Sequence, residues 1–241
     1  MTQKHHPLGS GFTAASTADE VLRGMDLSGT NVVVTGGHAG IGLETTRALS
    51  NAGAAVTVGA RVVNVTSGGH RLSDIRWDDP QFNTGYDPLL AYGQSKTANV
   101  LFAVELDRRW ADESIRGYAV HPSVVVTTNL GRSMPADQKR AMNLAMELID
   151  DSGRPIIDPA QEKKTAQQGA SASVFAATSP LLAGLGGVYL MNNDISPLDE
   201  YAKSIAFGAE PVVESTVVPH APDPDSAHRL WELSEQLIKS N

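Results

Sequence analysis

The sequence has no cysteine, and this absence excludes disulfide frameworks, thiol catalysis and cysteine-rich zinc sites. It has no run of Lys and Arg, and its net charge of -8 lacks the electrostatic footprint of a protein that binds nucleic acid or an anionic membrane surface. No apolar run approaches the ~20 residues of a membrane span, and residues 1–16 contain no signal-peptide core. We therefore expect a cytoplasmic protein with neither a nucleic-acid nor a membrane partner.

The most informative local pattern lies at residues 31–51. The β-branched residues Val32 to Thr35 lead into a cluster of glycines, and apolar residues then recur at helical spacing, which predicts a strand, a tight turn and a helix that ends at residues 51–53, where Gly53 is a good stop. Gly36 can take the turn, Gly40 leaves room for backbone to approach a ligand, and Gly42 allows helix and strand to pack closely. Because a helix start offers N–H groups to a pyrophosphate, the pattern favours a phosphate site, although ordinary turns also use glycines.

The rest of the chain divides into three parts. We expect an N-terminal tail and short helix over residues 1–25, a single domain over 26–215 and a C-terminal helical extension over 216–241. Residues 1–15 look like a loose tail, and Thr17 and Glu20 then have capping-box spacing. Helices are predicted over 89–110, 134–149, 161–177 and 225–238, strands over 115–120 and 187–191, and a long loop over 70–88.

Residues 56–66 do not fit an ordinary parallel sheet. Val56–Ala60 and Val62–Thr66 each have the composition of a strand, yet Arg61 alone separates them. Parallel neighbours need a crossover of a dozen or more residues. Either the two stretches form one long strand, or a segment that normally separates them is missing.

Two side chains are candidates for acid–base chemistry. Tyr92 and Lys96 lie four residues apart on the predicted helix 89–110, so they share one face. A nearby ammonium favours the phenolate, which would suit Tyr92 as a general acid and base, although such pairs are also common on solvated helices. Ser67 ends a strand before a double glycine, where its hydroxyl can point into the crevice at the carboxyl ends of the strands.

In this order, the motifs resemble those of the short-chain dehydrogenase/reductase family, and their wording is similar to its retinol-dehydrogenase-like branch. Thr35–Gly42 matches the cofactor loop, Val63–Ser67 the serine strand and Ala91–Asn99 the catalytic helix, while His121–Thr127 corresponds to the segment over the nicotinamide. The resemblance implies an α/β fold, Rossmann-like and doubly wound, with a mostly parallel sheet. Domain 26–215 would then be an NAD(P)-binding domain.

The resemblance also implies hydride transfer between NAD(P) and a small neutral alcohol or carbonyl substrate. Tyr92 would exchange a proton with the substrate oxygen, Lys96 would support Tyr92 and bind the nicotinamide ribose, and Ser67 would hydrogen-bond the developing oxyanion. Arg61 would pair with a 2′-phosphate, which favours NADP over NAD. The implied cofactor-binding residues are Gly36, His38, Gly40, Ile41, Gly42, Arg61, Tyr92, Lys96, Val125 and Thr127, of which Val125 and Thr127 would hold the carboxamide.

The chain departs from the family pattern by a deletion near Arg61. The family has a third strand, a fourth strand with an Asn-Asn-Ala-Gly motif and a helix with a catalytic Asn at this point. This chain lacks all three elements, which together take on the order of 60 residues. Ser123 also stands where the family prefers Gly. Because the missing helix usually contributes to a subunit interface, we expect Val100, Leu101 and Val104 to be exposed and to favour homo-oligomers.

The sequence is also compatible with other folds and functions. A single strand over residues 56–66 could pair directly beside the first strand. Alternatively, the chain could borrow a strand from a second copy or fail to reach a unique fold. The rival hypothesis is a non-catalytic, internally deleted remnant or binding protein. A serine hydrolase is disfavoured because no Gly-x-Ser-x-Gly elbow occurs. The residues His38, His70 and His121 are too scattered to predict a metal site, so no metal is expected.

Overall fold

A four-stranded sheet forms the centre of the computed structural model, which describes residues 5–32, 34, 40–54, 60–126, 128, 131, 134–200 and 216–239. The strand order is β1-β2-β5-β6. Strands β1 (Arg61–Val65), β2 (Arg116–His121) and β5 (Val188–Met191) run parallel, and β6 (Asp194–Ile195) pairs antiparallel with β5. A separate parallel pair joins β3 (Val124–Val125) to β4 (Lys163–Lys164).

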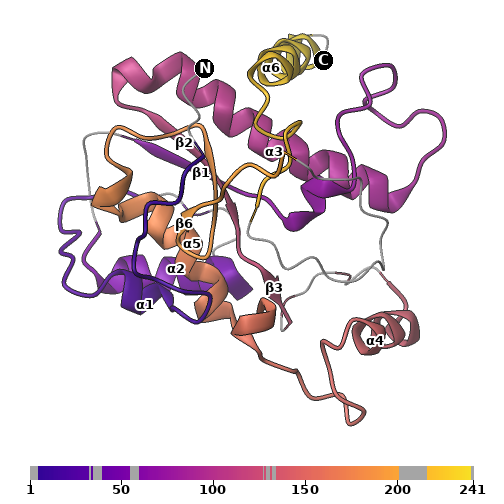
Figure 1. Ribbon diagram of the computed structural model, residues 1–241, viewed down its shortest axis with the longest axis horizontal. Coiled ribbons are helices and arrows are strands. Elements are labelled where there is room, and N and C mark those ends of the chain that lie inside the picture. The colour runs from indigo at the N-terminus through magenta and orange to yellow at the C-terminus, as the bar shows by residue number, and fades with distance from the viewer. Residues whose placement is uncertain are drawn as a thin grey trace.

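Helices cover both faces of the sheet (Figure 1). On one face lie α1 (Ala18–Val21), α2 (Gly40–Asn51) and α5 (Ala166–Thr178), and on the other lie α3 (Pro88–Trp110) and α6 (Pro224–Lys239). A further helix, α4 (Ala136–Ala145), follows β3, and four short 3-10 turns span Gly68–Arg71 (η1), Ala111–Glu113 (η2), Pro159–Gln161 (η3) and Pro180–Leu182 (η4). This arrangement confirms the predicted α/β class with a mostly parallel, shortened sheet.

Side chains of the central strands alternate between two apolar clusters. In β2, Tyr118 and Val120 belong to the cluster under α1, α2 and α5, whereas Ala119 between them belongs to the cluster under α3. This period of two follows from the pleat of a strand, which points successive side chains to opposite faces. Gly117 of the same strand allows α3 to approach closely, because a Cβ there would lie 2.3 Å from the carbonyl oxygen of Ala103.

Several predicted helix boundaries are confirmed. Thr17 and Glu20 form the capping box of α1, and α2 ends at Asn51, just before Gly53 with a left-handed φ of 87°. The predicted helix 161–177 begins later, at Ala166. Glu162 has a left-handed φ of 59° and β4 follows it, so those residues cannot open the helix.

The expected loose tail at residues 1–15 is wrong for its described part. Asp194 in β6 accepts hydrogen bonds from the backbone N–H groups of Leu8, Gly9 and Ser10 at 2.6–3.2 Å. Phe12 packs edge-on against Phe175 of α5, with ring centroids 6.0 Å apart. The N-terminal segment therefore belongs to the main packing unit.

The expected exposure of Val100 and Leu101 is also wrong. Both side chains are fully buried, and Val104 is half-buried. Leu101 and Val104 pack with residues of α6, which lies beside α3 (Figure 1), whereas Val100 packs against the sheet and residues 217–221. Trp231 of α6 packs between the rings of Phe102 and Trp110, with each pair of centroids 5.3 Å apart. The covered face removes the reason to expect self-association through these residues.

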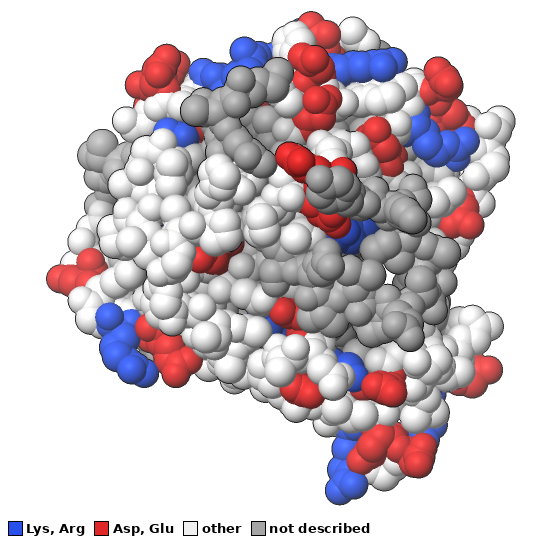
Figure 2. Space-filling model, viewed as in Figure 1, with Lys and Arg blue, Asp and Glu red and all other residues white. Residues whose placement is uncertain are grey.

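The region before β1 differs from the prediction or lies outside the described residues. No strand is assigned to Asn31, Val32 or Val34, and residues 33, 35–39 and 55–59 are not described. Val34 nevertheless packs against the same apolar cluster as Val63 of β1. In the described part of the chain, no helix is both long enough and apolar enough to span a bilayer. Figure 2 shows acidic and basic side chains interspersed around the margin of the face it presents.

Candidate active site

The serine expected at the site follows the carboxyl end of β1. Val65 lies opposite Val120 of β2, and the N–H of Thr66 donates to the Val120 carbonyl at 2.8 Å, which extends the ladder by one residue. Ser67 then caps the turn η1, its Oγ accepting a hydrogen bond from the N–H of Gly69 at 3.1 Å. Because that bond uses an oxygen lone pair, the hydroxyl proton of Ser67 stays available to a ligand.

Hydrogen bonds fasten α3 to this strand end. The hydroxyl of Thr66 donates to the carbonyl of Lys96 at 2.7 Å, and the amide of Asn99 donates to the carbonyl of Val65 at 3.0 Å. The buried hydroxyl of Thr97 reaches the carbonyls of His70 and Ser73. These bonds fix the helix face that carries Tyr92 and Lys96 relative to Ser67.

Tyr92 lies against the loop that follows Ser67. A Cβ built on Gly69 would lie 2.6 Å from Cε1 of Tyr92 and 3.6 Å from Oγ of Ser67. Glycine is therefore required at 69 for this approach, and the phenol ring and the serine hydroxyl lie near one another. The Nζ of Lys96 lies 5.2 Å from the centroid of the Tyr92 ring. The structure thus brings together all three residues predicted to be catalytic.

The charge of Lys96 has no acidic counterpart among the residues that the structure describes. Within the described ranges no carboxylate pairs with this ammonium, whose half-buried position lowers its pKa below the usual value. A partly desolvated cation without a counter-ion is poised to interact with ligand oxygen atoms and with a phenolate. The electrostatics therefore fit the position of Lys96 beside Tyr92.

The described cofactor-loop residues lie beside the segment after β2. Gly40 opens α2 with a left-handed φ of 54°, and a Cβ there would lie 3.7 Å from the methyl of Thr128. A Cβ on Gly169 of α5 would lie 2.4 Å from Val125 and 3.4 Å from Ile41, so both side chains approach that glycine. Gly42 lies in the first turn of α2, which contains no acidic residue. The predicted residues Gly36, His38 and Thr127 lie outside the described residues.

Arg61 does not join this site. It is the first residue of β1 and therefore lies at the amino edge of the sheet, opposite the edge that carries Ser67. Its guanidinium donates to the carbonyls of Ala176 and Ser179, both at 3.0 Å, where α5 ends. The placement corrects the expected contact with a 2′-phosphate, because a strand of five residues separates Arg61 from the carboxyl edge.

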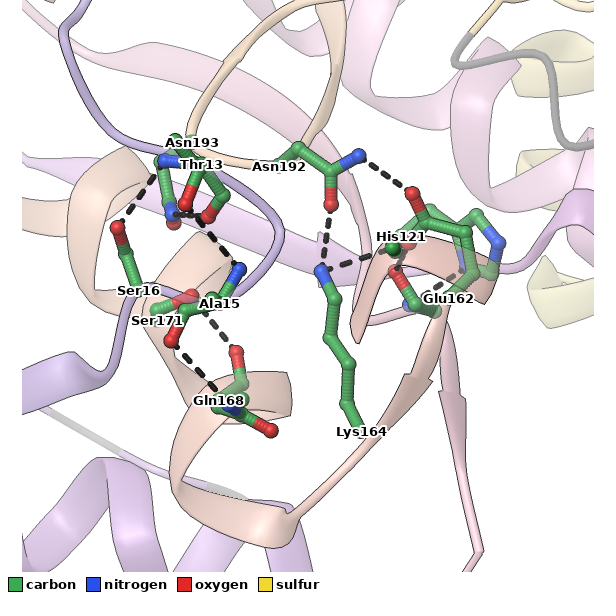
Figure 3. A network of polar contacts seen from close by, with 12 residues as sticks. Thr13, Ala15, Ser16, His121, Glu162, Lys164, Gln168, Ser171, Asn192 and Asn193 are labelled. Atoms are coloured by element: carbon green, nitrogen blue, oxygen red, sulfur yellow. Dashed lines mark hydrogen bonds and ion pairs between the residues drawn. The ribbon is translucent and has the colours of Figure 1, made fainter. Parts of the chain in front are cut away.

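Sequence reasoning missed a polar network around Glu162, which Figure 3 shows with Lys164 and Asn192. Ser123, with a left-handed φ of 66°, donates its hydroxyl to Oε2 of Glu162, and Asn192 donates to Oε1 of Glu162 at 2.7 Å. The ammonium of Lys164 donates to Asn192 and lies 3.5 Å from Glu162. Burial lowers the pKa of Lys164, and the Glu162 charge opposes this shift. The replacement of the family's Gly by Ser123 was the one signal in the sequence.

Two histidines near the site are neutral at neutral pH. Burial lowers the pKa of His70 to about 4 and that of His121 to about 3. His70 donates from Nδ1 to the Ser67 carbonyl and accepts at Nε2 from the N–H of Val218, so both ring nitrogens are engaged. His121 accepts at Nδ1 from the N–H of Ser123 at 3.2 Å. These contacts assign the two rings to holding the loops in place.

No family model matches the chain. A protein of Streptomyces lividans named "Probable oxidoreductase" is 38% identical over 205 residues, which cover 85% of this chain and 62% of the relative. A Penicillium roqueforti protein named short-chain dehydrogenase/reductase is 29% identical over 180 residues, or 74% of this chain and 47% of the relative. The chain is thus similar to proteins named as oxidoreductases and as a short-chain dehydrogenase/reductase.

The chain spans about half to three-fifths of the length of these relatives. The solved L-sorbose reductase of Gluconobacter frateurii, a complex with NADPH and L-sorbose, is 15% identical. Its TM-score is 0.35 over 72% of this chain and 68% of that one, too distant a likeness to transfer a site. The resemblance to the retinol-dehydrogenase-like branch stays a prediction.

Proposed function

We propose that the protein is an NAD(P)-dependent oxidoreductase that interconverts an alcohol and a carbonyl by hydride transfer. The observation that carries this proposal is the meeting of Ser67, Tyr92 and Lys96 at the carboxyl edge of β1, with Gly69 making room for the phenol ring. Ligands of open α/β sheets bind at this edge. Relatives named as oxidoreductases support the same reaction class.

Each of the three residues has a role that follows from its surroundings. The Tyr92 hydroxyl would exchange a proton with the substrate oxygen, and the ammonium of Lys96 would stabilise the phenolate that this exchange leaves. The Oγ of Ser67 already accepts a hydrogen bond from the Gly69 N–H, so its proton would point to the oxygen that gains negative charge. Proton transfer and charge stabilisation would then act on one substrate atom.

The residues at this edge fit a nicotinamide dinucleotide, which would supply or accept the hydride. Gly40 leaves a space that a side chain would fill, and the half-buried Lys96 lacks a counter-ion among the described residues. Lys96 would bind the ribose hydroxyls and Val125 the carboxamide, and the start of α2 would face the pyrophosphate. The prediction of NADP over NAD depended on Arg61, which lies at the opposite edge of the sheet. Titration with each cofactor therefore has to decide between the two.

We propose a small, neutral alcohol or carbonyl compound as the substrate. The loops predicted to shape the substrate pocket, 70–88 and 130–159, mix apolar and polar residues without a cluster of one charge. Asp79, which carries charge in the first loop, is engaged by the backbone N–H groups of Asn83 and Thr84 at 2.8 and 2.9 Å. Such a carboxylate is committed to loop structure and is not free to bind a charged substrate.

The test is a titration of the purified chain with NADPH and then with NADH, followed by tryptophan fluorescence and melting temperature. Saturable binding with a rise in melting temperature supports the proposal. Lys96→Met should weaken binding, whereas Lys239→Met, a matched change in an exposed side chain of α6, should leave it unchanged. A cooperative melting transition without binding of either cofactor would favour the rival, a non-catalytic remnant, which the absent catalytic-Asn helix also favours.

A further inference from the structure

The short strand β3 is held in an unusual way. It pairs with β4 and not with the main sheet, and the N–H of Val124 donates to the carbonyl of Glu162 at 3.0 Å. The preceding residue, Ser123, has a left-handed φ of 66°, a conformation that costs free energy for any residue other than glycine. Some contact must hold Ser123 in this conformation, and the side chain of Glu162 provides one.

The Glu162 carboxylate is shared between two parts of the fold. Ser123 and Glu162 are 8% and 9% exposed, and the serine hydroxyl donates to one carboxylate oxygen. Asn192, in the turn between β5 and β6, donates to the other oxygen. The ammonium of Lys164 contacts both Asn192 and Glu162 (Figure 3). A buried, charge-assisted hydrogen bond is stronger than a neutral one. The carboxylate therefore ties β3 to the hairpin of the main sheet.

The tied segment reaches both halves of the candidate site. Two residues beyond Ser123, Val125 lies against Gly169, which Ile41 at the start of α2 also approaches. Two residues before it, His121 accepts the Ser123 N–H, and its Nε2 would lie 3.2 Å from a Cβ on Gly68. A shift of Ser123 would consequently move Val125, and it would push His121 against Gly68 in the loop that follows Ser67.

We propose that Glu162 is a positioning residue that fixes β3 through Ser123, so that Val125 meets the nicotinamide end of the cofactor. This inference rests on the proposed function for its effect on cofactor binding. Its structural half, the anchoring of β3, holds in the ligand-free protein. Lys164 and Asn192 complete the anchor by neutralising and orienting the carboxylate. The network accounts for a serine at a position where the family prefers glycine.

The decisive variant is Glu162→Gln, with Glu147→Gln as its matched control. Glu147 pairs with Lys163, the neighbour of Lys164, at 3.3 Å, but its side chain is 77% exposed, so its removal should have little effect. We expect Glu162→Gln to weaken NADPH binding roughly tenfold through the loss of a charge-assisted bond. Ser123→Gly keeps the left-handed backbone at no steric cost and loses the same bond, so it provides a second test in a fold without strain.

A double-mutant cycle separates positioning from general destabilisation. If Glu162 acts through Ser123, then Glu162→Gln should weaken binding less than about threefold once Ser123→Gly is present, because the two changes remove one interaction. Fully additive losses would overturn the proposal. Equal losses in Glu162→Gln and Glu147→Gln would do the same.

Hydrogen exchange in the ligand-free protein makes the test independent of the proposed function. Glu162→Gln should speed exchange of the Val124 and Val125 amides while leaving β1 protected, and Glu147→Gln should change neither. Unchanged exchange at β3, or equal acceleration throughout the sheet, contradicts the anchoring role. A wild-type chain that binds no cofactor refutes the proposed function, and the exchange pattern then still decides whether Glu162 fixes β3.

Discussion

Replacing Gly69 by alanine tests whether Tyr92 must lie against the serine loop. The added methyl carbon would lie 2.6 Å from Cε1 of Tyr92, whereas ordinary contact begins at 3.4 Å. Gly69 has no left-handed φ, so alanine adds no backbone strain. The phenol ring must therefore move by about 1 Å, and a displacement of that size in an active site lowers the rate by about 100-fold.

The assay is reduction of a carbonyl panel with NADPH, together with cofactor binding and thermal unfolding. We expect Gly69→Ala to lower kcat/KM about 100-fold, or about 2.7 kcal/mol in transition-state stabilisation. Overpacking should cost about 1 kcal/mol in unfolding free energy. Binding of NADPH should persist, because the change displaces the acid–base group and leaves the start of α2 intact.

The neighbouring glycine provides the control. A Cβ on Gly68 would lie 3.2 Å from Nε2 of His121, so that ring needs to move by only a few tenths of an ångström. Gly68→Ala should therefore lower kcat/KM by less than about fivefold. In a Tyr92→Phe background, Gly69→Ala should add little, since the displaced hydroxyl is already gone. Equal losses in the two alanine variants, or wild-type turnover in Gly69→Ala, would show that turnover does not depend on the position of Tyr92 against Gly69.

Three further predictions concern the framework, each checked by urea denaturation. Leu101→Ala should lower the unfolding free energy by about 3 kcal/mol because this side chain is fully buried, whereas the exposed Leu89→Ala should cost under about 0.5 kcal/mol. Since burial lowers the pKa of His70 to about 4, the unfolded chain binds the proton first as pH falls, and this residue alone should lower the free energy of unfolding by about 2 kcal/mol from pH 7 to pH 5. A His70→Gln variant should lose less over that range. Asp194→Ala removes the acceptor of residues 8–10 and should cost about 2 kcal/mol, with faster exchange there.

The helix that carries Tyr92 and Lys96 and the turn that carries Ser67 were predictable because their signals are local. Tyr92 and Lys96 share a helix face through their spacing alone, and Ser67 precedes two glycines at a strand end. The confirmed end of α2 before Gly53 depends on a single backbone preference. Such features need no knowledge of distant parts of the chain.

The features that could not be predicted depend on long-range packing. Ser123 and Glu162 lie 39 residues apart, and nothing in either neighbourhood marks the other as its partner. The cover that α6 provides for Leu101 likewise depends on how a distant helix returns to α3. The predicted contact of Arg61 with a 2′-phosphate was wrong for a different reason, because this residue follows one strand-like stretch and begins another. Its assignment to the second stretch places it at the opposite edge of the sheet.

The most direct measurement is turnover of NADPH with a panel of small neutral aldehydes and ketones, comparing the wild-type chain with Tyr92→Phe. We expect measurable reduction by the wild type and a loss of at least about 100-fold in Tyr92→Phe, with cofactor binding retained and the melting temperature unchanged. Equal turnover by the two proteins would contradict the assignment of Tyr92 as the proton donor. A folded wild-type chain that binds NADPH and NADH without reducing any member of the panel would contradict the proposed catalytic role of this site.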